Sequence, residues 1–179
     1  MSPTQWRMVG QKVDMWGEVG HSGDQPPVLR GFDGEDGRER SEVFLGEYFH
    51  SLDGKGRVVM PSSFRRRLED GCVVTKGQDR QLVIFSAEDF EKKASEVIER
   101  PQDRGGRRFS RTVFGGADLQ TLDKSGRVLV KPELREFADV ETATEIAVIG
   151  VFDHVELWKK EVYLADRETG DETYLDVEA

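Results

Sequence analysis

The chain repeats one short motif, and this repetition limits the possible folds more than any other feature of the sequence. The segment "FHSLDGKGRVVMP" begins at Phe49, and "LQTLDKSGRVLVKP" begins at Leu119. At a constant shift of 70 residues, both contain leucine, aspartate, glycine, arginine and valine at matching places. After a three-residue insertion the match resumes, because "VVTKG" and "LVIF" correspond to "IAVIG" and "VELW". The sequence therefore predicts two copies of one supersecondary unit.

Each copy has the same predicted order of elements. In the first copy, β-branched and aromatic runs on either side of a glycine-bearing turn at 53–56 are typical of a β-hairpin. A short helix follows, with Ser62 or Ser63 as its expected N-cap. Two further strands lead into a longer helix, for which we expect Ser86 as N-cap and Asp89 as the acid of a capping box. The second copy repeats this order and ends in a short helix.

The size of each copy predicts how the two combine. A unit of about 50 residues is small for an independent hydrophobic core. Two copies with the same apolar pattern would bury each other's exposed faces, so we expect one compact, β-rich α+β unit with pseudo-twofold symmetry. Its expected parts are a first repeat at 43–98, a basic linker at 99–113 and a second repeat at 114–163.

The two ends of the chain differ in composition from the repeats. Residues 1–42 scatter glycine, proline and charge without a sustained period, which indicates a disordered N-terminal extension. Residues 164–179 hold six acidic residues and one basic residue, which indicates a loose acidic tail. The net charge of the chain is −9, yet residues 43–163 hold 20 basic and 21 acidic residues. Local basic patches therefore decide more about a nucleic-acid partner than the total charge does.

Several classes of protein fit this sequence poorly. No apolar run approaches the roughly 20 residues of a membrane span, and the first residues lack the pattern of a secretory signal. The single cysteine, Cys72, lies in an apolar run and reads as a small buried side chain in a reducing cytoplasm. None of the three histidines, His21, His50 and His154, begins a metal-ligand spacing. We therefore expect no enzyme activity, no cofactor, no metal, no small-molecule substrate and no membrane partner.

The twin turns carry the residues with the clearest chemistry. The aspartate of each turn can accept hydrogen bonds from turn amides, and the arginine begins the following strand. Taken singly, such a motif is most simply a structural ion pair under a hairpin. Duplication on a pseudo-symmetric unit adds a second interpretation, two related DNA-contacting loops, since arginine can bind guanine edges or phosphate in a bidentate manner. The residues alone leave both interpretations open. In the second interpretation the contact residues are Asp53, Lys55 and Arg57 in the first turn and Asp123, Lys124 and Arg127 in the second.

The doubled turn, the proline after "RVVM" and the segment "VIGVFDHVELW" resemble the MraZ family of bacterial transcriptional regulators. The resemblance covers about 43–163, with both family D-x-x-x-R motifs present at 53–57 and 123–127. It implies AbrB-like swapped-hairpin units that form a double-ψ-type barrel with short flanking helices. It also implies a ring-like homo-oligomer that binds short direct repeats in double-stranded DNA. The implied target is the promoter of the division and cell-wall gene cluster that includes the protein's own gene, which it would repress from the cytoplasm and nucleoid.

Two further hypotheses follow from the same comparison. An antitoxin-like or scaffold protein of this fold is the main alternative, and a stable heteromeric complex in a pull-down would favour it. The family's usual beginning corresponds to "VFLGEY" at Val43, so we hypothesise that translation starts there. Peptides from residues 1–42 in mass spectra of the native protein would contradict that start.

Overall fold

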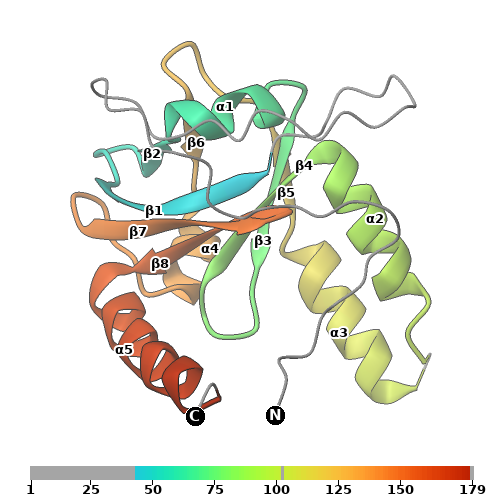
Figure 1. The fold of residues 1–179 in the computed structure, drawn as a ribbon. Coiled ribbons are helices and arrows are strands. Elements are labelled where there is room, and N and C mark those ends of the chain that lie inside the picture. Colours follow the sequence, from blue (N-terminus) through green and yellow to red (C-terminus); the bar gives the residue numbers. More distant parts are fainter. Residues whose placement is uncertain (1–42, 102, 178–179) are drawn as a thin grey trace, which may run out of the picture. The chain divides into compact units, whose positions relative to one another are not determined.

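A computed structural model describes residues 43–101 and 103–177, and the elements of its two halves follow one order (Figure 1). The first half consists of β1 (Phe44–Ser51), β2 (Arg57–Val59), α1 (Ser62–Leu68), β3 (Cys72–Lys76), β4 (Leu82–Ser86) and α2 (Ala87–Ile98). After α3 (Arg104–Gly115), the second half consists of β5 (Asp118–Gln120), β6 (Arg127–Leu129), α4 (Pro132–Phe137), β7 (Glu145–Phe152), β8 (His154–Lys159) and α5 (Lys160–Val177). The expected extension at 1–42 lies outside the described residues.

The sheet shows the internal symmetry directly. In the described residues, six strands pair in the order β1-β7-β8-β4-β3-β5, and β2 pairs separately with β6. Exchanging every strand for its counterpart in the other half gives the same order read backwards. The pseudo-twofold axis therefore passes between β8 and β4, whose antiparallel pairing joins the halves. The fold is α+β with an antiparallel sheet, and within the described residues the expected closed barrel is not formed, because β1 and β5 remain at the two edges.

The expected local hairpin between the first two strands is wrong. β1 pairs with β7 of the other half, from Phe44 opposite Phe152 to Ser51 opposite Glu145. In the equivalent way, β5 pairs with β3, and the short β2 pairs with β6. The strands leave the turn without pairing with each other because pairing between halves buries the apolar faces of both copies, which a local hairpin would leave in water.

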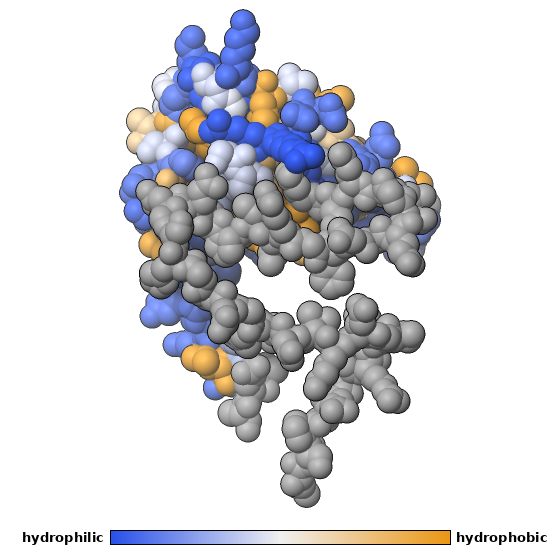
Figure 2. Space-filling model, turned by 45° about the horizontal axis from the view of Figure 1, so that its top comes forward, coloured by the Kyte–Doolittle hydropathy of each residue, from blue (hydrophilic) through white to orange (hydrophobic). Residues whose placement is uncertain are grey.

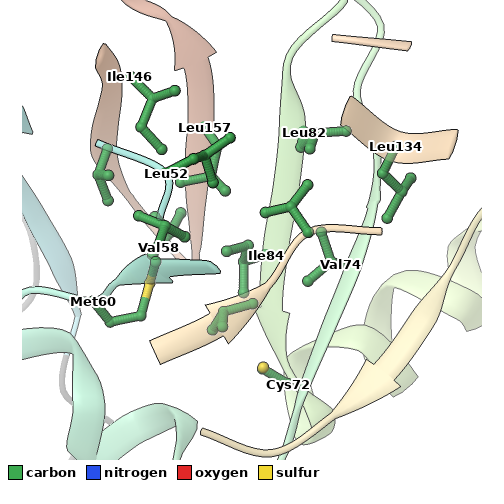
Figure 3. Close-up of a cluster of buried hydrophobic side chains, with 14 of the residues drawn as sticks. Leu52, Val58, Met60, Cys72, Val74, Leu82, Ile84, Leu134, Ile146 and Leu157 are labelled. Carbon is green, nitrogen blue, oxygen red and sulfur yellow. The ribbon is translucent and has the colours of Figure 1, made fainter. Parts of the chain in front are cut away.

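Side chains from both halves meet in one hydrophobic core (Figure 3). Val58 and Val128 lie opposite each other at the centre of the β2–β6 pair, and both are fully buried. Figure 3 shows Leu52 and Val58 of the first half beside Ile146 and Leu157 of the second. Because each half supplies one side of this core, neither half could bury its own apolar residues alone.

Of the N-caps predicted for α1 and α2, only that of α2 is confirmed. Ser86 caps α2 by accepting a hydrogen bond from the backbone amide of Asp89, at 3.1 Å, and this prediction is confirmed. In contrast, the N-cap of α1 is Pro61 and no side chain caps that helix, so the expected serine cap is wrong. Pro61 takes the position because its fixed φ, here −48°, suits the entry to a helix.

The C-terminal segment is more ordered than its composition indicates. We expected a short helix and then a loose tail, but α5 continues to Val177. The first part of α5 is held to β1, since the hydroxyl of Tyr163 and the guanidinium of Arg167 both donate to the carboxylate of Glu47 at 2.7 Å. This anchor lets the acidic residues beyond it extend the helix. Among the helices of the described residues, none is both long and apolar enough to cross a membrane.

Candidate nucleic-acid interface

The two turns have the same hydrogen bonds. In the first, one carboxylate oxygen of Asp53 accepts from the backbone amides of Lys55 and Arg57, at 2.9 and 3.0 Å. The other oxygen accepts from Nε of Arg57 at 2.8 Å. In the second turn Asp123 bonds to Ser125 and Arg127 at the same three distances. Each aspartate therefore fixes both its turn and its arginine.

Pairing of β2 with β6 brings the two turns together. The guanidinium of Arg57 lies 3.4 Å from the carboxylate of Asp123, and that of Arg127 lies 3.7 Å from the carboxylate of Asp53. These four residues, which we call the turn cluster, form a closed ring of alternating charge. The sequence predicted related turns on a symmetric unit. It did not predict the ion pairs that join the turn of one copy to the turn of the other.

The turn cluster and its lysines face solvent. The side chains of Arg57 and Arg127 are 27% and 28% exposed, so each guanidinium is fixed yet reachable by a ligand. Lys55 and Lys124 are exposed at the tips of the turns. Figure 2 brings forward the end of the molecule where α1 lies in Figure 1, and hydrophilic side chains project from it. All six residues predicted to contact DNA are thus gathered at one place.

A second pair of arginines supports the turns, and sequence reasoning missed its role. Nε of Arg65 on α1 donates to the carbonyl of Met60 at 2.8 Å, while Nε of Arg135 on α4 donates to that of Val130 at 3.2 Å. Each of these arginines packs against the glycine in the turn of the other half. The repeat does relate these two arginines, because each follows the turn arginine of its own copy by eight residues.

Those turn glycines are required by the backbone and by this packing. Gly56 and Gly126 have φ of +75° and +72°, a region that residues with a Cβ rarely adopt. A Cβ on Gly126 would collide with the guanidinium of Arg65, and one on Gly56 would lie 3.0 Å from Nε of Arg135. The two halves are therefore interlocked at the turns, and each turn is held by residues of both copies.

The electrostatics of the cluster keep its carboxylates ionised. The side-chain hydrogen bond from Arg57 lowers the pKa of Asp53 from 3.8 to about 2, and the backbone bonds add to this effect. For Asp123, loss of hydration opposes the shift, but the bonds from Arg127 and from the Ser125 amide outweigh it and lower the pKa. The arginines consequently keep their charged partners throughout the physiological pH range.

We expect the carboxyl carbon of Asp53 to titrate with a midpoint near pH 2 in an NMR experiment. Because the folded-state pKa is depressed, the ion pair stabilises the turn above pH 3.8 and this contribution is lost as the pH falls toward 2. In the Arg57→Ala variant the midpoint should move back toward 3.8. A wild-type midpoint already at 3.8 would show that the guanidinium does not hold this carboxylate.

Other groups with possible reactivity lie away from the turn cluster. Cys72 is fully buried in the core, as predicted, and burial raises the pKa of its thiol to about 11. Nδ1 of His154 lies 2.6 Å from the carboxylate of the neighbouring Asp153. Within residues 43–101 and 103–177, no group of three or more histidine, cysteine, aspartate or glutamate side chains could hold a metal ion.

Comparison with known proteins agrees with this arrangement of two copies. Residues 43–109 and 113–168 match the family model of the MraZ protein, so the match spans both turns and more than half of the chain. A transcriptional regulator MraZ from Finegoldia magna is 42% identical over 123 residues, which are 66% of this chain and 82% of that protein.

Relatives from other bacteria carry the same name. A transcriptional regulator MraZ from Nocardioides sp. is 43% identical over 116 residues, covering 64% of this chain and 79% of that protein. One from Salinispora arenicola is 38% identical over 130 residues, covering 70% and 90%. With both turn motifs inside the matched segments, the chain belongs to the MraZ family.

Proposed function

We propose that this protein is a sequence-specific DNA-binding transcriptional regulator, without catalytic activity, whose DNA contacts are made by the turn cluster and its two lysines. The observation that carries the proposal is the joining of both turns into one exposed, rigid group of cations and carboxylates. Relatives named as transcriptional regulators support the same function. The contact residues are those predicted: Asp53, Lys55, Arg57, Asp123, Lys124 and Arg127.

The geometry suits recognition of a DNA groove. An arginine held by a carboxylate keeps its free nitrogen atoms in one orientation, so little side-chain entropy is lost when they bind a guanine edge or a phosphate. The turn cluster itself is neutral, because its two arginines balance two aspartates. Lys55 and Lys124 give this face its net positive charge. In this arrangement the arginines read bases and the lysines bind phosphates.

A single pair of turns buries little surface, so we infer that affinity comes from repetition. A ring of identical subunits would present many such pairs and bind several short direct repeats at once, which raises the effective concentration of each contact. The proposed operator lies in the promoter of the division and cell-wall gene cluster that includes the protein's own gene. Repression of that promoter places the protein in the cytoplasm, on the nucleoid.

The exchange of strands between halves supports an AbrB-like origin of the fold. β1 and β5 each pair with a strand of the other copy, and β2 pairs with β6 across the pseudo-twofold axis. We propose that these pairings are the swapped-hairpin relationship in which two copies of one unit are interleaved. On this view the turn cluster is the point where the interleaved units meet.

A gel shift with DNA from upstream of the protein's own gene tests the function. We expect a specific complex whose affinity falls steeply between about 50 and 200 mM salt, because binding to phosphates releases counterions. A scrambled DNA of the same length is the control and should bind more weakly. Equal affinity for both DNAs would contradict sequence-specific recognition, and a stable complex with a toxin-like protein in place of DNA binding would favour the antitoxin-like alternative.

A further inference from the structure

Two helices of opposite charge lie on different halves of the sheet. α3 carries four arginines, all exposed, and its residues 104–115 include no acid. α5 carries six acidic residues against two basic ones. α3 packs beside β3 and α5 packs on β7 and β8, so the two helices are well separated in Figure 1. The described unit therefore has a basic side and an acidic side.

The arginines of α3 form a stripe that points away from the sheet. Arg104, Arg108 and Arg111 are spaced by four and three residues and share one helix face. The opposite face holds Val113, whose carbonyl accepts a hydrogen bond from the hydroxyl of Thr75 on β3. Within the part of the chain that the structure describes, these three arginines form no ion pair. Their charge is available to a partner.

The acidic residues of α5 form a matching stripe. Glu161, Glu168 and Glu172 are exposed and are spaced by seven and four residues, so they also share one face. The opposite face of α5 holds Tyr163 and Arg167, which anchor the helix to β1. The stripe therefore points to solvent, as the arginine stripe of α3 does.

We propose that α3 of one copy docks against α5 of the next copy, with the arginine stripe against the acidic stripe. The partner is a second copy because α5 is fixed on the other half of the sheet from the α3 of its own chain. Arg104 and Arg108 are four residues apart, as are Glu168 and Glu172, so two ion pairs can form in one contact. A contact between two different surfaces of one chain repeats from copy to copy and can close into a ring.

The end of α5 also supplies apolar contact, which ion pairs at an interface need because charge gives orientation more than affinity. Leu175 and Tyr174, near the end of α5, are 69% and 66% exposed. Leu175 lies at the edge of the acidic stripe, so it can add apolar contact beside the ion pairs.

A charge swap in the full-length protein, followed by sedimentation at low salt, tests this interface. The Arg104→Glu/Arg108→Glu variant and the Glu168→Lys/Glu172→Lys variant should each associate at least about tenfold more weakly and sediment toward the 20.3 kDa monomer. The variant with all four substitutions should regain the oligomer, because attraction returns with its signs exchanged. Glu91→Lys on α2, which changes one exposed charge elsewhere, should leave sedimentation unchanged.

The outcomes distinguish a failure of this interface from a failure of the proposed function, on which the interface proposal rests. If either double variant keeps the wild-type oligomer, or the fourfold variant does not regain it, this interface is wrong although self-association stands. If the α3 variant only weakens DNA binding, α3 is a DNA-binding surface and the proposal is overturned. A monomeric wild-type protein would reject the proposed assembly itself, whereas operator affinity in the gel shift tests DNA recognition independently.

Discussion

Replacing Arg57 or Arg127 by alanine is expected to reduce operator affinity by at least about 100-fold in a gel shift. Each guanidinium offers one contact to a base edge or a phosphate, worth about 1–3 kcal/mol. In a ring bound to several repeats, every engaged subunit loses that contact, so the losses combine. The fold should survive, because Asp53 and Asp123 still accept hydrogen bonds from the amides of their own turns.

Two further variants distinguish the contribution of the planar guanidinium group from that of its positive charge. Lys93→Ala removes one positive charge from α2, where Lys93 is paired with Glu96, and should leave operator affinity unchanged. Arg57→Lys keeps the charge but loses the planar group, so we expect an intermediate affinity and weaker discrimination between operator and scrambled DNA. Unchanged operator affinity of Arg57→Ala, with the oligomer intact on size exclusion, would contradict the assignment of this site.

Local sequence patterns predicted the order of the strands, the start of α2 and the two turns. Ser86 predicted the start of α2, because an N-cap depends on residues only three apart in the chain. The aspartate and arginine of each turn predicted the bonds within that turn, since these too are local. Repetition at a constant shift predicted two equivalent halves. Each of these conclusions depends on residues that are close in sequence.

Pairing between the halves could not be predicted from the same patterns. The runs at 44–51 and 57–59 are compatible with a local hairpin, and nothing in them states that β1 would pair with β7 instead. The choice depends on how much apolar surface each pairing buries, which involves residues about 100 positions away. The ion pairs of Arg57 with Asp123 and of Arg127 with Asp53 were missed for this reason, because they exist only once β2 pairs with β6.

The acidic tail shows the opposite error, in which composition indicated too little structure. Acidic and polar residues after Leu164 are typical of loose chain, yet the same segment contains residues that are compatible with a helix once one begins. Helix nucleation is the costly step, and the bonds from Tyr163 and Arg167 to Glu47 fix the first turns. A contact with a strand so far away in the sequence cannot be recognised from the residues of the helix alone.

Phe64→Ala is expected to lower the free energy of unfolding by about 3–5 kcal/mol, the cost of removing a large aromatic side chain from a packed core. Phe64 is 1% exposed, and its ring meets those of Phe44 and Tyr48 edge to face, with centroids 5.3 Å apart in both cases. It holds α1, which carries Arg65, against β1. Urea unfolding at a fixed protein concentration measures the loss, since self-association also contributes to apparent stability.

The repeat itself supplies the matched control for this variant. Leu134 occupies the equivalent place on α4 and is 3% exposed, so the second half packs a leucine where the first packs Phe64. Phe64→Leu should therefore cost only about 1–1.5 kcal/mol, because most of the apolar volume remains and a related helix already packs that way. A loss as large as that of Phe64→Ala would show that the edge-to-face contacts with Phe44 and Tyr48, and not burial alone, fix α1 beneath the turn cluster.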